Sequence, residues 1–408
     1  MTPFASHVER VQSVWQQIAA TGRVNSLRVI EAFADSGLNQ TDLAGSTGYG
    51  YGDRGRESLD RVFAAALNAE AALVRPQWAS GTHVLTTTLK ALLAPGDELW
   101  IADGRVYDTL HPLLGDTHPL SLGRRGVRVR QAWLSPSGIF MPVEKCDRRP
   151  QWVFIQRSRG YSPDLEWDRE RIRQVIAAAH ALGASVLVDN CYGEFTEAEE
   201  PTAWGADLIA GSLLKNPGGG IAPTGGYVAG KAELVRLVGD ELIAPTLGSE
   251  VGPTGPYLRL FAQGLFLAPQ LVGEALMGAA YFRSRWTEAG YEVRPEPSMP
   301  DLITAIRLQE PTRVKRFCRA IQQLGPIDAH VIPEPWEMPG YADPVIMAAG
   351  GMIAGASLEL SCDAPMLPPY WVYVQGGLSR WHAVMACERS LLAAAPNTPA
   401  EAPQPGPK

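Results

Sequence analysis

Lys215 lies at the end of a short apolar run, and a lysine in such a position can react covalently with a ligand. The run 211–214 precedes it, and an Asn-Pro pair and three glycines follow it. Burying an amine costs free energy unless the protein uses it, and lysines in such positions form Schiff bases with carbonyl compounds. The stretch alone leaves one alternative open, a structural lysine that reaches over a glycine turn.

Asp189 favours the chemical interpretation of Lys215. It ends the run 185–189, whose apolar and β-branched residues indicate a buried parallel strand. Its side chain would therefore emerge at the carboxyl edge of an open α/β sheet, where ligands bind. Enzymes that use pyridoxal phosphate (PLP) need this pair, because the lysine binds the aldehyde and the carboxylate keeps the pyridine nitrogen protonated.

The composition is that of a globular protein and excludes several other classes. The chain has 408 residues, of which 46% are hydrophobic and 19% charged, enough for two domains and a large core. Its net charge of −7 argues against nucleic acid as the main partner. The five cysteines are scattered, so we expect neither a metal site nor a disulfide framework. We see no signal peptide and no membrane-spanning run, and therefore predict a cytoplasmic protein.

Strand and helix patterns alternate through the first part of the chain. Two helices are predicted before this alternation, at 6–20 and 26–34. The alternation itself is typical of a mainly parallel sheet with crossover helices. It consists of strands at 98–102, 127–133, 152–156, 185–190, 207–210 and 226–229, and helices at 58–72, 84–93 and 168–182.

A second, smaller unit follows a long apolar segment at 253–281, which indicates a connecting helix. The pattern after it indicates an α+β domain, with strands at 302–308, 356–360 and 370–374 and helices at 312–324 and 379–394. We therefore predict five parts: N-terminal helices and an arm (1–55), a large domain (56–252), the connecting helix (253–282), a small domain (283–394) and a disordered tail (395–408).

Two segments could bind an anion such as a phosphate. The turn Ser80-Gly81-Thr82 opens a predicted helix, where backbone N–H groups and hydroxyls bind phosphate, although an ordinary Ser/Thr cap has the same sequence. The glycine-rich loop at 48–56 follows no strand, so it is not a dinucleotide-binding loop. It is either a surface loop or an arm that presents Tyr51 and Arg54 to an anion, in its own or a neighbouring subunit.

Other residues near predicted strand ends also have two interpretations each. Tyr107 could lay its ring on a flat cofactor or simply pack. Arg157 and Arg159 follow the strand at 152–156 and could bind an anionic ligand group, or form a solvated surface pair. His83 could be a packed core residue or a ligand.

Six segments together resemble the PLP-dependent enzymes of cysteine and methionine metabolism, which have fold type I. They most resemble the methionine γ-lyase-like branch, whose members are often described as aluminium-resistance proteins. The matching segments are 49–56, 74–77 with 80–83, 156–161, 188–195, 211–219 and 373–378, in the family's order. The resemblance implies a large domain with a mainly parallel sheet of the seven-stranded type and a smaller C-terminal α+β domain.

The resemblance also implies roles for individual residues. Lys215 would bind PLP covalently and Asp189 would pair with the pyridine nitrogen. Tyr107 would stack on the ring and act as an acid or base near the leaving group. The phosphate would be held by Ser80, Gly81, Thr82 and Ser212.

A neighbouring subunit would complete each site by this resemblance. Tyr51 and Arg54 are similar to the Tyr and Arg that reach the phosphate of the adjacent subunit. The smallest active unit would then be a homodimer, with a homotetramer usual in the family.

The chain departs from the branch pattern at one place. Where the branch has an arginine after Asp-x-Pro-x, this chain reads Asp363-Ala364-Pro365-Met366-Leu367. Such an arginine normally holds the substrate α-carboxylate. We expect another arginine to take this role, with Arg159 preferred over Arg380 and with Arg157 as a further candidate.

The resemblance predicts a lyase that removes a heteroatom leaving group from an amino acid by γ- or β-elimination. Methionine, cystathionine and canavanine are candidate substrates. An aminotransferase, aldolase or racemase would use the same lysine and aspartate but leave the side chain attached. A PLP-binding accessory protein without turnover is the non-catalytic alternative.

Overall fold

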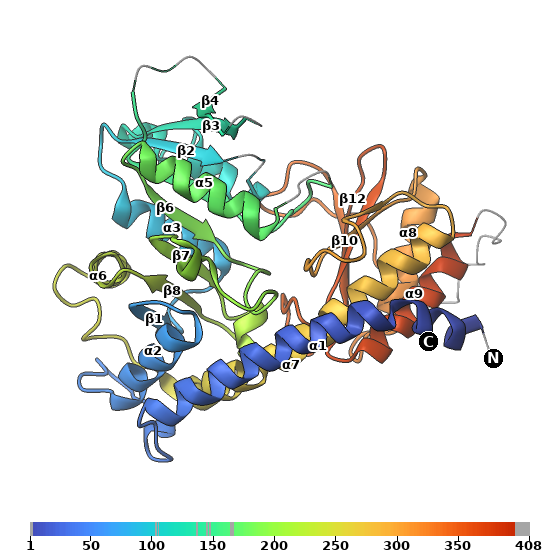
Figure 1. The fold of residues 1–408 in the computed structure, drawn as a ribbon, viewed down its shortest axis with the longest axis horizontal. Coiled ribbons are helices and arrows are strands. Elements are labelled where there is room, and N and C mark those ends of the chain that lie inside the picture. Colours follow the sequence, from blue (N-terminus) through green and yellow to red (C-terminus); the bar gives the residue numbers. More distant parts are fainter. Residues whose placement is uncertain are drawn as a thin grey trace, which may run out of the picture.

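Two β-sheets lie at opposite ends of the molecule, joined by two long helices (Figure 1). The computed structural model describes residues 3–102, 104, 106–135, 138–143, 146, 148–163 and 167–395, with side chains from His7 onward. The predicted tail lies outside the described residues from position 396 onward.

The larger sheet has eight strands, and five neighbouring strands in it are parallel: β7, β6, β5, β2 and β3. Strand β8 is antiparallel to both of its neighbours, and β4 is antiparallel to β3. The spatial order is β1 (Ala71–Arg75), β8 (Gly226–Gly230), β7 (Leu208–Ser212), β6 (Ser185–Asp189), β5 (Trp152–Gln156), β2 (Glu98–Ala102), β3 (Arg128–Leu134) and β4 (Phe140–Pro142). The predicted α/β class is confirmed, with β4 as an eighth strand at the edge.

Helices cover both faces of this sheet, because its central strands are apolar on both sides. In β5, Val153 and Ile155 pack in one core cluster, whereas Phe154 packs in another. The first cluster contains side chains from α2 (Arg54–Ala66), α5 (Arg169–Ala181) and α7, and the second contains side chains from α3 (Gly81–Leu92) and α6 (Ala232–Leu242). This three-layer arrangement leaves the carboxyl ends of the parallel strands open for a ligand.

The smaller sheet is antiparallel throughout, and α8 (Pro311–Gln322) and α9 (Arg380–Ala394) pack together beside it. Cys362 and Ala364 of one strand and Val372 and Val374 of the next lie in its apolar core. The intervening residues therefore face the other side of the sheet. The strand order is β11 (Val345–Ala349), β12 (Ser361–Pro365), β13 (Trp371–Gln375), β10 (Thr304–Arg307) and β9 (Val293–Arg294).

The helices α1 (Pro3–Asp35) and α7 (Leu258–Glu288) run side by side along both units (Figure 1). The indole N–H of Trp15 donates to the carbonyl of Met277 at 2.9 Å. By length and composition the stretch Gly255–Glu288 could cross a membrane, but 67% of its most apolar window is buried inside the protein. Its apolarity is therefore explained by packing between the two units.

Several predicted boundaries are wrong. The two N-terminal helices are one continuous helix, because α1 packs along α7 through Gly22, where the backbone of Pro269 lies close. Residues 356–360 are a turn and not a strand, although Leu358 and Leu360 are buried, since burial alone does not identify a strand. Strands β1, β4, β9, β11 and β12 were not predicted, and the helix predicted at 58–72 overlaps the first two residues of β1.

The remaining short helical segments connect these elements. They are α4 (His111–Leu114), η1 (Asp42–Ala44), η2 (Asp108–Leu110), η3 (Gly123–Arg125), η4 (Pro201–Trp204), η5 (Asn216–Gly218) and η6 (Gly255–Tyr257).

Candidate active site

A cavity of about 460 Å³ lies between the carboxyl edge of the larger sheet and one face of the smaller sheet. The larger sheet contributes residues that follow β5, β6 and β7, and the N-terminus of α3 forms one side. The smaller sheet contributes Asp363, Tyr373 and Gln375, and Ile303 lies just before its strand β10. The cavity thus has two walls that come from different parts of the chain.

Lys215 and Asp189 enter this cavity from neighbouring parallel strands. In the β6–β7 pairing Asp189 is opposite Ala210, and the chain then turns after Ser212, where the Lys215 N–H donates to the Ser212 carbonyl at 3.1 Å. Gly218 keeps this turn tight, since a Cβ there would lie 1.7 Å from the carbonyl oxygen of Leu213. The local sequence therefore fixes where the lysine emerges.

The two groups have perturbed pKa values. Burial raises the pKa of Asp189 to about 6, against weaker opposing effects of the Cys191 hydrogen bonds and the Lys215 charge. Its Oδ1 accepts a hydrogen bond from the Cys191 N–H at 3.1 Å. Burial acts to lower the pKa of Lys215, but the negative potential of Tyr192, Cys191 and Asp363 outweighs it and raises that pKa. A buried carboxylate without a full cationic partner is suited to receive a protonated ring nitrogen.

The N-terminus of α3 lines the same cavity as these residues. Ser80 caps the helix, because its Oγ accepts from the His83 N–H at 3.2 Å. A Cβ on Gly81 would lie 3.3 Å from Cys191 Sγ and 3.4 Å from Ser212 Cβ, so a larger residue would narrow the cavity here. Free backbone N–H groups and hydroxyls at a helix start suit a phosphate.

These groups together fit PLP. A lysine, a buried carboxylate and a helix N-terminus line one cavity, and they are of the types that could hold the aldehyde, the pyridine nitrogen and the phosphate. Among the described residues, no group of three His, Cys, Asp or Glu side chains could hold a metal ion. The predicted residues Ser80, Gly81, Thr82, Tyr107, Asp189, Ser212 and Lys215 all line the cavity.

A cluster of tyrosines closes the cavity on the side of the smaller sheet. The Tyr107 hydroxyl hydrogen-bonds to the hydroxyl of Tyr341, and the Tyr161 hydroxyl donates to Oδ2 of Asp363 at 3.1 Å. The Tyr161 ring lies 5.1 Å from that of Tyr373, centroid to centroid. Burial first, and Asp363 second, raise the pKa values of Tyr107 and Tyr161, so both phenols keep their protons.

Tyr192, Tyr341 and Asp363 are among the cavity residues to which the sequence analysis gave no role. The Tyr192 hydroxyl accepts from Lys215 Nζ at 2.6 Å, and its φ of 68° is uncommon for a bulky residue. Its position three residues after Asp189 is the sequence feature that could have indicated that Tyr192 lies in the cavity. Tyr341 and Asp363 come from the second unit, more than a hundred residues from Lys215 in sequence, and no local pattern indicates that they meet it.

The arginines expected to bind the substrate carboxylate do not line this cavity. Arg159 is 2% exposed, and its Nε donates to Asp301 at 2.8 Å. The guanidinium of Arg380 donates to Glu274, with Nε 3.0 Å from Oε2. Both are therefore already paired with a carboxylate.

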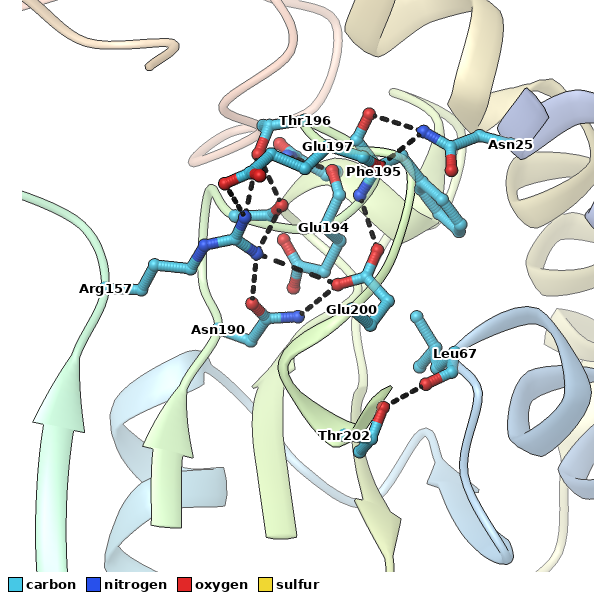
Figure 2. Close-up of polar contacts among 12 residues, drawn as sticks. Asn25, Leu67, Arg157, Asn190, Glu194, Phe195, Thr196, Glu197, Glu200 and Thr202 are labelled. Atoms are coloured by element: carbon cyan, nitrogen blue, oxygen red, sulfur yellow. Dashed lines mark hydrogen bonds and ion pairs between the residues drawn. The ribbon is translucent and has the colours of Figure 1, made fainter. Parts of the chain in front are cut away.

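Arg157 does not line the cavity and is the centre of a polar network (Figure 2). It donates to Oδ1 of Asn190 at 2.8 Å, to the Gly193 carbonyl at 2.8 Å and to the Thr196 hydroxyl at 3.1 Å. Asn25 of α1 donates to the Phe195 carbonyl of the same loop at 2.9 Å. The network holds the loop that follows Asp189 instead of presenting a free cation.

Tyr51 and Arg54 lie away from the cavity of their own chain. Tyr51 is 63% exposed and the Arg54 side chain 71% exposed. His83 is also exposed, and its Nδ1 accepts from the Ala79 N–H at 3.2 Å, so it is neither a core residue nor part of the cavity lining.

Comparisons with known proteins identify the family. The family model for methionine γ-lyase matches residues 4–394. The uncharacterized protein YnbB of Bacillus subtilis (strain 168) is 39% identical over 382 residues, 91% of either chain.

Two solved structures are similar over almost their whole length. One, from Listeria monocytogenes strain 4b F2365, is described as a candidate cystathionine β-lyase involved in aluminium resistance. It has 39% identity and a TM-score of 0.91, covering 97% of this chain and all of the other. The second, from Clostridium novyi NT, is described as a carbon–sulfur lyase involved in aluminium resistance. It has 39% identity and a TM-score of 0.88, covering 95% and 94% of the two chains.

These comparisons, together with the fold, show a PLP-dependent lyase of fold type I. More specifically, the chain belongs to the methionine γ-lyase family. The predicted family, fold class, cofactor and lyase class are thereby confirmed.

Proposed function

We propose that this protein cleaves a carbon–heteroatom bond in the side chain of an amino acid by γ- or β-elimination. The observation that carries the proposal is the joint exposure of Lys215, Asp189 and the α3 N-terminus to one cavity. The names of the Listeria and Clostridium relatives, which refer to β-lyase and carbon–sulfur lyase activity, support it. Methionine, cystathionine and canavanine carry leaving groups of the required kind.

Lys215 is proposed to move the protons of the reaction. Bound PLP supplies an aldehyde for the substrate amine and a ring that withdraws electrons from the substrate Cα. The Lys215 amine reaches into the cavity beside Tyr192, where it can take the proton from Cα. In a γ-elimination the same amine would also remove the proton from Cβ.

Asp189 and Tyr107 have complementary proposed roles. Asp189, ionised and 4% exposed, would hold the proton on the ring nitrogen by charge and hydrogen bonding. Tyr107 keeps its proton because burial raises the pKa of its phenol, and it can give that proton to the departing heteroatom. The tyrosine cluster would exclude bulk water from the reacting atoms.

We further propose that two subunits share each active site. Tyr51 and Arg54 are exposed on their own chain, and the backbone of the same loop is held by Arg56, which donates to the Gly50 and Gly252 carbonyls at 2.9 Å. A rigid loop with an exposed Tyr and Arg is suited to reach the phosphate of an adjacent subunit. The assembly would be a homodimer or a homotetramer.

The test is a screen of the purified, PLP-loaded protein against amino acids with β- or γ-leaving groups, with 2-oxo acid and ammonia measured together. We expect stoichiometric release of both with at least one substrate, and none with Lys215→Ala. Formation of the amine form of the cofactor without side-chain release would instead support an aminotransferase.

A further inference from the structure

Asp363 faces the cavity because of its place in β12. The neighbours Cys362 and Ala364 lie in the apolar core of the smaller unit, so Asp363 projects from the opposite face of the sheet. Tyr373, its partner in the pairing of β12 with β13, projects from the same face and also lines the cavity. A carboxylate thus occupies the wall opposite Asp189.

Acidic side chains outnumber basic side chains in the lining of the cavity. The charged side chains among the described residues that line it are Lys215, Asp189 and Asp363. Burial raises the pKa of both carboxyl groups, and the positive charge of Lys215 acts against this by favouring their ionised forms. The arginines 157, 159 and 380 do not line the cavity, as described above. A positively charged group of a ligand would therefore be stabilised beside Asp363.

The two carboxylates belong to different parts of the site. Asp189 lies on the wall with Lys215 and the α3 N-terminus, where the proposed cofactor contacts gather. Asp363 lies on the other wall among tyrosines, and the Tyr161 hydroxyl donates to its Oδ2 at 3.1 Å, which fixes the orientation of the carboxylate. A substrate side chain would extend from the cofactor toward this second wall.

We propose that Asp363 binds a positively charged group in the substrate side chain, so that the substrates are amino acids with an amine or guanidine group beyond the bond that is cleaved. This inference rests on the proposed function and narrows it. It disfavours substrates with a neutral side chain such as methionine. The hydroxyl of Ser158 and the amide of Gln375, which also line the cavity, can donate hydrogen bonds to the α-carboxylate.

The test compares two thioether substrates of nearly equal shape, S-(2-aminoethyl)-L-homocysteine and S-propyl-L-homocysteine, with the PLP-loaded enzyme. They differ by an ammonium in place of a methyl group, and the released thiol gives kcat/KM for each. We expect the aminoethyl substrate to be preferred by at least about 30-fold, as for a charge-paired group in a partly dry site. The corresponding pair of S-substituted L-cysteines tests the same preference for β-elimination.

The variant Asp363→Asn should lose this preference, mainly through a fall in kcat/KM for the aminoethyl substrate. Asp343→Asn is the matched control, since Asp343 is a carboxylate outside the cavity lining, and it should keep the preference. Equal rates of the wild type on both substrates would overturn the inference and leave the proposed function intact. An equal loss for both substrates in Asp363→Asn would also overturn it, because Asp363 would then act only as a counter-ion of Lys215.

A binding measurement separates the inference from the proposed function. L-Lysine and L-2-aminoheptanoate have side chains of equal length and no leaving group, and their affinities for the PLP-loaded protein can be measured by calorimetry. We expect tighter binding of lysine in the wild type and equal binding in Asp363→Asn. If no thioether is cleaved but this pattern holds, Asp363 binds the cationic group of the ligand, and these thioethers are excluded as substrates. Equal affinities in the wild type would contradict the inference directly.

Discussion

The variant Asp189→Asn is expected to stabilise the PLP-free protein while it abolishes turnover. Asp189 is 4% exposed, and burial raises its pKa from 3.8 to about 6. The folded protein therefore binds this proton more tightly than the unfolded chain does. A pKa difference of about 2 corresponds to about 3 kcal/mol by which the ionised carboxylate destabilises the PLP-free fold at neutral pH.

The sign of the pH dependence follows from the raised pKa. The wild type is most stable, relative to Asp189→Asn, below about pH 4, where the carboxyl is protonated in both the folded and the unfolded state. Its stability falls as the pH rises through the window from about 4 to about 6, and it then stays low. The stability advantage of Asp189→Asn should therefore be about 3 kcal/mol above pH 6 and should vanish as the pH falls through that window.

Urea denaturation of the PLP-free wild type and variant, at about pH 7.5 and about pH 4.5, measures this difference. Added PLP should reverse the order at neutral pH, because the ring nitrogen gives the wild-type carboxylate a cationic partner. Asp343→Asn is the control for the loss of one negative charge outside the cavity. Equal stability of the PLP-free wild type and Asp189→Asn at neutral pH, or an advantage that does not depend on pH, would refute the reasoning.

Other variants test the remaining parts of the site. Tyr341→Phe removes the hydroxyl that hydrogen-bonds to Tyr107, the proposed acid. It should lower kcat about tenfold with little change in PLP content. An unchanged kcat would remove Tyr341 from the mechanism. An inactive Arg54→Ala chain mixed with an inactive Lys215→Ala chain should recover part of the activity, and no recovery in verified mixed dimers counts against a shared site. Arg159→Ala should cost about 2 kcal/mol of stability, because Asp301 loses its partner, with KM unchanged. A raised KM at intact stability would restore Arg159 as the carboxylate ligand.

The large sheet and its reactive edge could be predicted because they depend on short, local patterns. Strands β2, β5 and β6 are buried over nearly their whole length, and their apolar runs mark them closely in the sequence. A polar residue that directly follows or ends such a run must emerge at the sheet edge. Asp189 and Lys215 could therefore be placed relative to each other without knowledge of the rest of the fold.

The wall formed by the second unit could not be predicted in the same way. Asp363 lies in a five-residue strand whose neighbours include a cysteine, an alanine and a proline, a pattern with little strand signal. Tyr341 lies outside any helix or strand, and its contact with Tyr107 joins segments 234 residues apart. Such contacts depend on how the two units pack.

Arg159 illustrates a different difficulty. Its position after β5 was correctly associated with the reactive edge, but its partner Asp301 lies 142 residues further along the chain. A buried arginine satisfies its charge with whichever carboxylate the fold supplies. The sequence shows that Arg159 lies at the carboxyl edge of the sheet, but not that its guanidinium is paired with Asp301 in the folded protein.

The most direct test of the account is the identity of the lysine that binds the cofactor. The protein is incubated with PLP, reduced with borohydride and digested, and the peptide that carries the cofactor is identified by mass spectrometry. The account predicts a single labelled site at Lys215 and no stable label in Lys215→Ala. Stoichiometric labelling of any other lysine would contradict the assignment of the active site.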